Sequence, residues 1–137
     1  MRNMLIQRLA LLFIVLLSAA CETTNVYPST NKSFTYSIGP DQWTDHRYRI
    51  FHSLLVPELT DYYLKQGGIH VSISFNHEES YDILPATFDG VAYSVQYTKG
   101  KVTIFGEDPL LDPNIYVPKP TQTVKIKIVL TDSEHVK

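Results

Sequence analysis

The residues around Cys21 indicate its chemistry more clearly than those around any other residue do. It is the only cysteine among the 137 residues, and three small residues, at positions 18–20, come immediately before it. Two arginines lead into the unbroken apolar run of residues 9–17. A positively charged start, an apolar run and small residues at its end are the layout of a secretory signal peptide. The sequence therefore predicts a cleavable targeting segment over residues 1–20.

The segment before Cys21 resembles the bacterial lipobox, in which a signal peptidase cuts immediately before a cysteine whose sulfur carries diacylglycerol. The resemblance implies that Cys21 becomes the first residue of the mature chain and carries acyl chains such as palmitate. The alternative is a retained membrane-spanning helix, which needs about 20 apolar residues. The apolar run of residues 9–17 is too short for that, so we expect a lipoprotein signal peptide and a lipid anchor at Cys21.

The histidines do not form a metal-binding pattern in the sequence. No two of them have the four-residue spacing of a helical zinc pair. We expect His52 to be a buried, hydrogen-bonded histidine of a strand rather than a catalytic base. His77 stands beside Glu78 and Glu79 in a predicted solvated turn. We therefore expect no metal and no cofactor to be bound by the five histidines, which are His46, His52, His70, His77 and His135.

The chain also lacks the sequence signatures of a hydrolase. It contains no Gly-x-Ser-x-Gly turn for a nucleophilic serine. A carboxylate pair for glycoside chemistry has no support, because Glu58 and Asp61 fit a helix start and Glu107 and Asp108 fit a loop. With Asp112, the loop pair is a candidate for weak calcium binding, but a solvated acidic loop is the preferred interpretation. No catalytic residue and no enzyme activity are expected.

Aromatic residues are the candidates for binding. The chain has nine tyrosines, six phenylalanines and one tryptophan. Exposed aromatic rings stack on sugars and contact proteins, and the candidates are Trp43, Tyr62, Tyr63 and Tyr116. On the strands of a small sandwich, however, aromatic side chains ordinarily fill the core or form cross-strand pairs. A core position is preferred for Trp43, and both interpretations stay open for the three tyrosines.

Length and charge limit the organisation and the partners of the chain. Residues 21–32 are polar and contain Pro28, so we expect a flexible tether that reaches on the order of 15–20 Å. A single domain is expected over residues 33–137. Two of the 12 basic residues precede Cys21, which leaves ten against 14 acidic residues and a formal charge of −4. Nucleic acid is therefore not expected as a partner, and membrane attachment should come from the acyl chains.

The alternation of apolar and polar residues predicts most of the strands. Lys99 and Gly100 are expected to close a hairpin. Residues 81–88 are a further candidate strand, which Pro85 confines to a sheet edge or bends. The other predicted strands are residues 33–38, 47–56, 69–75, 91–97, 102–106 and 122–131.

One helix of about two turns is predicted after the second strand. Pro57 fits its first turn because proline has no amide donor to satisfy there, and Gly67-Gly68 supplies a left-handed residue to end it. Residues 106–120 hold four prolines and are expected to form a surface connection. Six or seven strands, one short helix and no βαβ alternation predict a mainly β fold, an antiparallel β-sandwich.

Five short blocks, in their order along the chain, resemble small secreted or lipid-anchored β domains common in the Bacteroidetes group of bacteria. The similarity spans residues 34–130, and His70 and Ser74 depart from it. It implies a β-sandwich in the bacterial cell envelope, anchored at the outer membrane, and no particular activity. Surface lipoproteins of these bacteria carry an acidic run after the cysteine, and residues 22–25 lack one, which favours the periplasmic side. The blocks are Gly39-Pro40-Asp41-Gln42-Trp43, Val56-Pro57-Glu58-Leu59-Thr60, Gly68-Ile69-His70-Val71-Ser72-Ile73, Ile83-Leu84-Pro85-Ala86-Thr87-Phe88 and Gly100-Lys101-Val102-Thr103-Ile104.

The sequence favours a lipid-anchored envelope protein whose non-enzymatic β-sandwich binds another protein or a surface polymer. A carbohydrate-binding accessory module is the first alternative, and a row of exposed aromatic rings would identify it. A small hydrolase is the second alternative. A cleft in which a histidine, a carboxylate and a nucleophile converge would support it.

Overall fold

A computed structural model gives the structure of residues 31–133. Cys21, the predicted signal peptide and the tether up to residue 30 lie outside these described residues. The last two tether positions are described, and Lys32 already begins the first strand. Within the described range, no helix has the length and apolar character needed to cross a membrane.

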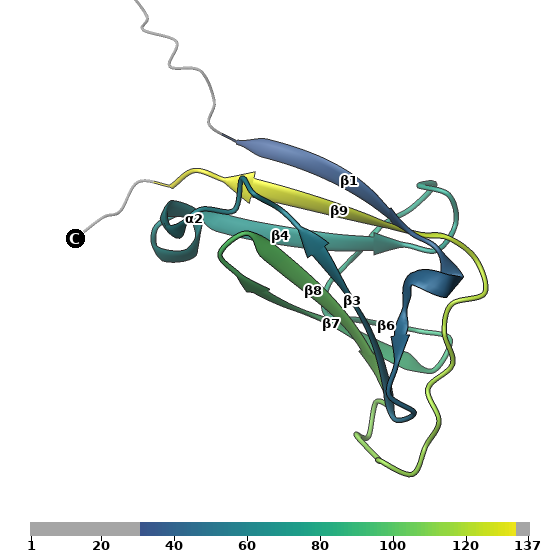
Figure 1. Cartoon of the computed structure of the whole chain (residues 1–137). Coiled ribbons are helices and arrows are strands. Elements are labelled where there is room, and N and C mark those ends of the chain that lie inside the picture. The colour runs from purple at the N-terminus through teal and green to yellow at the C-terminus, as the bar shows by residue number, and fades with distance from the viewer. Residues whose placement is uncertain (1–30, 134–137) are drawn as a thin grey trace, which may run out of the picture.

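Two antiparallel sheets pack face to face, so the predicted mainly β sandwich is confirmed (Figure 1). One sheet has the order β1 (Lys32–Ile38), β9 (Val124–Thr131), β4 (Gly68–Ser74), β5 (Asp82–Ile83). The other has the order β2 (Thr44–Asp45), β3 (Arg49–Leu55), β8 (Lys101–Glu107), β7 (Val91–Thr98), β6 (Ala86–Phe88). A short 3-10 helix, η2 (Pro40–Gln42), and one α-helix, α2 (Asp61–Lys65), complete the described elements.

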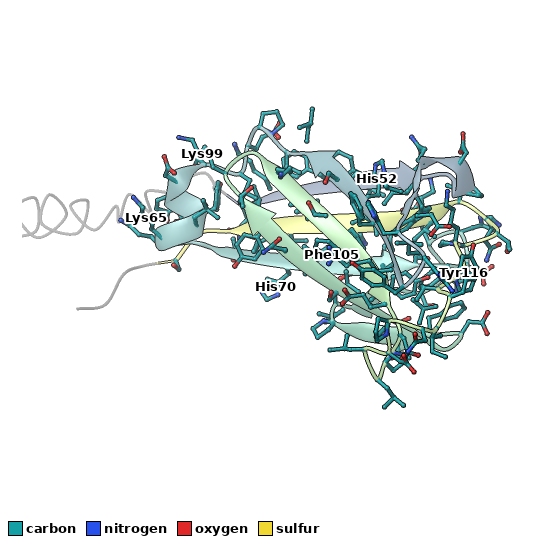
Figure 2. The ribbon with its side chains drawn as sticks, turned by 60° about the horizontal axis from the view of Figure 1, so that its bottom comes forward. His52, Lys65, His70, Lys99, Phe105 and Tyr116 are labelled. Carbon is teal, nitrogen blue, oxygen red and sulfur yellow. The ribbon has the colours of Figure 1, made fainter. Side chains whose placement is uncertain are left out.

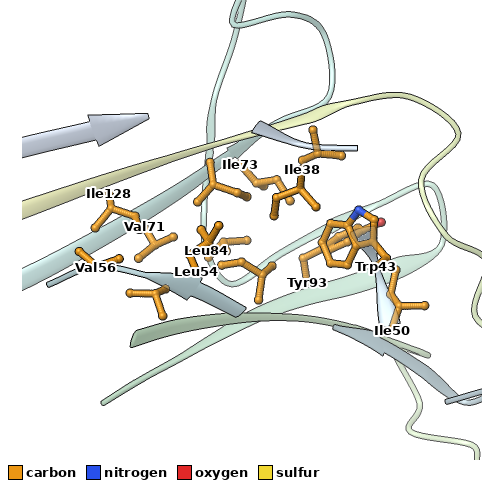
Figure 3. Packing of buried hydrophobic residues seen from close by; sticks show 14 of the residues in the cluster. Ile38, Trp43, Ile50, Leu54, Val56, Val71, Ile73, Leu84, Tyr93 and Ile128 are labelled. Carbon is orange, nitrogen blue, oxygen red and sulfur yellow. The ribbon is translucent and has the colours of Figure 1, made fainter. Parts of the chain in front are cut away.

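The core lies between the two sheets and follows from the alternation of side chains along each strand. On β9, every second residue points inward, and Val124, Ile126, Ile128 and Leu130 have no exposed surface. Each such buried aliphatic side chain stabilises the fold by about 1.5–3 kcal/mol. Figure 3 shows side chains from both sheets meeting in this layer, with Trp43 and Tyr93 at one end of it.

The predicted start of the helix is wrong, and so is the left-handed glycine expected after it, whereas its last residue, Lys65, is as predicted. The helix begins at Asp61 rather than at Pro57, because Val56 and Leu59 are both fully buried and hold the intervening chain in a turn closed by a 2.9 Å hydrogen bond from Leu59 N to Val56 O. The two glycines that follow do not adopt the left-handed conformation that was expected. They are needed for close packing, since a Cβ atom at Gly67 would lie 2.7 Å from the carbonyl oxygen of Thr131.

The predicted strand over residues 81–88 is two short strands in different sheets. β5 pairs with β4 and β6 pairs with β7, and the chain changes sheet at Leu84 and Pro85, which are joined by a cis peptide bond. Leu84 is buried between the sheets. Pro85 therefore marks a bend, which was one of the two expectations for it.

Both ends of the described chain lie at the α2 end of the sandwich, on the left in Figure 1. The amide of Asp132 donates a 2.7 Å hydrogen bond to the side-chain oxygen of Asn31, and the hydroxyl of Ser133 donates to the carbonyl oxygen of Gln66. The opposite end, called the distal end below, carries the turns at residues 39–48, 75–81 and 89–90 and the loop of residues 108–123. The predicted hairpin turn at Lys99 and Gly100 is confirmed and lies at the α2 end.

Candidate functional site

The structure does not bring the four candidate aromatic residues together. Trp43 and Tyr63 are 2% and 7% exposed, so both rings belong to the core. Tyr62 lies in α2 and is 37% exposed, and Tyr116 is 58% exposed in the loop at the distal end. Figure 2 shows the separation between the two ends, with Lys65 at one and Tyr116 at the other. These residues therefore form no row of rings for a glycan.

A different set of side chains gathers at the distal end. It consists of aliphatic and tyrosine side chains from the long loop and from the turn before β3, and we call it the distal apolar surface. Leu110 is 89% exposed and Leu111 is 71% exposed. Tyr48 and Leu111 line the same shallow cavity of about 190 Å³, which joins the turn to the loop. The full set is Tyr48, Leu110, Leu111, Ile115 and Tyr116.

Two carboxylates of the long loop bond to its backbone amides and fix the conformation in which these apolar residues are exposed. The side chain of Asp108 accepts hydrogen bonds from the amides of Leu110, at 2.9 Å, and of Asp112, at 3.2 Å. The side chain of Asp112 accepts a 2.8 Å bond from the amide of Asn114. These are the local side-chain-to-backbone bonds typical of aspartate in turns. Asp108 and Asp112 therefore shape the loop, as the preferred interpretation predicts. Glu107 does not belong to the loop, because it is the last residue of β8 and lies 3.6 Å from Arg49 in an ion pair.

A buried anchor fixes the loop to the sandwich. Val117 is 1% exposed, and its amide donates a 2.9 Å hydrogen bond to the carbonyl oxygen of Arg47. The hydroxyl of Tyr116 donates to the carboxylate of Asp45 at 3.3 Å, and the negative charge of Asp45 raises the pKa of this tyrosine. These contacts fix the loop against the turn that leads into β3, and the exposed leucines of the loop are therefore held in place.

An aromatic cluster that the sequence pattern does not predict lies on the outer face of the five-stranded sheet. The rings of Phe51 and Phe105 are 6.1 Å apart, and His46 stacks on Phe51 at 5.4 Å. Arg49 lies over the ring of Phe105, at 5.5 Å, and also over the ring of Tyr48, at 5.8 Å. Figure 2 shows Phe105 on this face. The cluster secures the turn that carries Tyr48, because each ring has a partner within the protein.

The histidines lie on separate elements. His52 is half-buried on β3, and its Nδ1 atom is 2.8 Å from the carbonyl oxygen of Gln42, so it is hydrogen-bonded as expected although less buried. His70 is exposed on β4, His77 lies in the turn after it, and His135 is outside the described residues. Within residues 31–133, no three histidine, cysteine, aspartate or glutamate side chains stand close enough to hold a metal ion.

The α2 end carries an exposed ion pair, and the large apolar or aromatic side chains exposed there are Leu55, Tyr62 and Tyr97. The ammonium group of Lys99 is 2.6 Å from the carboxylate of Asp61 and lowers the pKa of that carboxyl. Both groups are exposed, and water screens such pairs strongly. The pair therefore adds little stability.

Comparison with known proteins gives no relative for this chain. No protein-family model matches it, and neither a curated protein nor a solved structure matches it. The protein is a small antiparallel β-sandwich that carries the distal apolar surface at one end. The resemblance to Bacteroidetes envelope domains stays a prediction.

Proposed function

We propose that this protein is a lipid-anchored component of the bacterial cell envelope, attached through Cys21 to the periplasmic side of the outer membrane, whose sandwich binds another protein through the distal apolar surface. No enzymatic step is part of this proposal. The observation that carries it is the position of the exposed leucines and tyrosines, at the end of the sandwich opposite to the end where the described chain begins.

The geometry of the fold supports a binding end that faces away from the membrane. A tether that leads from Cys21 to β1 reaches the sandwich at its α2 end. The strands that run from that end to the distal end have seven or eight residues. At about 3.3 Å per residue, they place the distal apolar surface more than about 20 Å beyond the point of attachment. An anchored molecule would present its loops to partners in the surrounding space.

The chemistry of the surface supports a protein partner. Leu110, Leu111 and Ile115 are aliphatic, and two tyrosines border them. Exposed apolar patches of this kind mark protein-binding sites, and tyrosine is enriched in protein interfaces. Glycans favour aromatic ring faces instead, and a surface polymer is therefore the second candidate rather than the first.

In-cell photo-crosslinking tests the proposal. A photoreactive phenylalanine analogue is introduced at Leu110 in one strain and at Leu55 in a control strain. Leu55 is 75% exposed but lies at the α2 end. We expect a cross-linked protein of defined mass from position 110 and none from position 55. Equal adducts from both positions, or none from position 110, would contradict a protein-binding distal surface, and adducts with polysaccharide would favour the second candidate.

A further inference from the structure

A second cavity opens at the distal end, beside the turn between β6 and β7. Its volume is about 170 Å³. One wall consists of Phe75, Phe88, Asp89, Val91 and Tyr93, and the other consists of residues 118–122 of the long loop. None of these residues belongs to the distal apolar surface, so the cavity is a separate site.

The apolar part of this cavity is held in a fixed shape. The rings of Phe75 and Phe88 stack with their centres 4.1 Å apart and their planes 6° apart. Tyr93 packs against Phe75, with its ring centre 5.1 Å away, and Trp43 meets the ring of Tyr93 from another side at 6.3 Å. Prolines 118 and 120 line the opposite wall, and a proline ring fixes the backbone. The cavity is therefore formed before any ligand arrives.

The polar part of the cavity has hydrogen-bonding capacity that the protein does not use. Tyr93 is 4% exposed, and its hydroxyl has no hydrogen bond to any other residue within 31–133. Burial and the negative charge of Asp89 raise the pKa of Tyr93 to about 12, so the hydroxyl keeps its proton and is both a donor and an acceptor. At the rim, Asp89 and Lys119 provide an acceptor and a donor, and they form no ion pair with each other.

We propose that this cavity binds a single sugar ring, as the terminal or side residue of a glycan. The C–H face of a pyranose suits the phenylalanine and proline walls, and its hydroxyls suit Tyr93, Asp89 and Lys119. A purely apolar ligand would leave those polar groups without partners after removing them from water. An anionic ligand would be repelled by Asp89 at the rim, and a cationic ligand would be repelled by Lys119.

The size of the cavity supports one ring rather than a longer segment. Pockets that enclose a drug-sized ligand have volumes of about 300–1,000 Å³. A cavity of about 170 Å³ is smaller than this range, and its open mouth leaves room for the rest of a chain to extend into solvent. The proposal is independent of the protein-binding function, because it uses different residues and a different ligand.

Titration of the full-length protein with simple glycosides tests the proposal. The protein is kept in lauryldimethylamine oxide, a detergent without a sugar headgroup, and is titrated with the methyl glycosides of glucose, galactose, mannose and N-acetylglucosamine. Trp43 is the only tryptophan and its ring contacts that of Tyr93, so its fluorescence emission reports binding. Saturation-transfer NMR of the same glycosides gives a second readout. We expect at least one glycoside to bind with a saturable response.

Three variants make the result specific to the cavity. Tyr93→Phe keeps the ring and removes the hydroxyl, and Asp89→Asn keeps the shape at a position with φ of 48°, which asparagine tolerates. Each should weaken glycoside binding roughly three- to tenfold, as the loss of one hydrogen bond predicts. Tyr97→Phe, on the same strand but at the α2 end, is the matched control and should bind like the wild type.

Three outcomes would overturn the assignment to a sugar. The first is that none of the four glycosides gives a saturable response. The second is that N-acetylphenylalaninamide, a probe for a peptide side chain, saturates the site while the glycosides do not. The third is that both cavity variants bind the glycoside as tightly as the Tyr97→Phe control does.

Discussion

At Tyr93, burial and the nearby carboxylate of Asp89 raise the pKa of the phenol to about 12, above the ordinary tyrosine value of 10.0. The folded protein therefore holds this proton more tightly than the unfolded chain does. The stabilisation from Tyr93 is complete below pH 10 and is lost as the pH rises from about 10 to about 12. Relative to Tyr93→Phe, we expect the wild type to lose on the order of 1–2 kcal/mol of unfolding free energy over this interval.

Urea unfolding of the two proteins, followed by Trp43 fluorescence at several pH values from about 8 to 12, measures this difference. The other tyrosines and the lysines titrate in both proteins, so their effects cancel in the comparison. A difference in unfolding free energy that stays constant across the whole range would show that Tyr93 titrates at an ordinary pKa.

For single residues, the sequence predicts burial or exposure best where one physical effect determines it. The preferred core position of Trp43 is confirmed, because the side chain is 2% exposed. The adjacent Tyr62 and Tyr63 could not be separated, because a helix of five residues gives too short a pattern to define its buried face. Leu110 and Leu111 were missed, although two leucines between Pro109 and Pro113 have neither strand nor helix to bury them.

Among the elements, period-two alternation located the long strands because both sheets bury one face and expose the other. It could not locate short elements whose position depends on distant packing. The helix begins at Asp61 because Val56 and Leu59 are buried against the sandwich, and nothing in the local sequence reports that contact. Likewise, the division of residues 81–88 between two sheets arises from the pairing partners of β5 and β6.

The packing of β8 against its neighbours yields a prediction at the level of elements. A Cβ atom at Gly106 would lie 2.9 Å from Cγ1 of Ile50, 3.0 Å from Cγ1 of Val91 and 3.1 Å from Cε1 of Tyr93. All three neighbours are buried in the core. We expect Gly106→Ala to lower the free energy of unfolding by about 1–3 kcal/mol, the usual cost of overpacking.

Chemical denaturation of the Gly106→Ala protein measures this cost, and Gly39→Ala is the matched control. A Cβ atom at Gly39 would meet only flexible side chains, with Asp41 Oδ1 at 2.9 Å and Gln42 Oε1 at 3.5 Å, and the backbone there has an ordinary φ of −73°. The control should therefore stay close to the wild type. If the two substitutions cost the same, close packing at Gly106 does not explain why glycine occupies that position.

For the whole molecule, the two ends of the sandwich are expected to have different roles. Replacing Leu110 and Leu111 together with serine should leave the free energy of unfolding within about 0.5 kcal/mol of the wild type, because neither side chain contributes to the core. The same change should abolish the cross-links formed from a photoreactive group at Ile115. Leu55→Ser is the control and should leave these cross-links intact. Persistence of the adducts in the double variant would remove the distal apolar surface as the binding site.

The anchor gives a second prediction for the whole molecule. Replacing Cys21 with serine removes the sulfur that would carry diacylglycerol, so we expect the protein to leave the membrane fraction. Sedimentation of cell envelopes washed with high salt distinguishes lipid attachment from electrostatic attachment, since salt screens only the latter. A serine variant that still sediments with washed membranes would contradict attachment through Cys21.

Mass spectrometry of the intact protein, purified from the membranes of the organism that makes it, tests the central claim most directly. The lipid-anchor account predicts a polypeptide whose first residue is Cys21 and whose mass exceeds that of residues 21–137 by diacylglycerol and any further acyl chain on the amino terminus. A chain that begins at Met1, or one in which the thiol of Cys21 is unmodified, would contradict it.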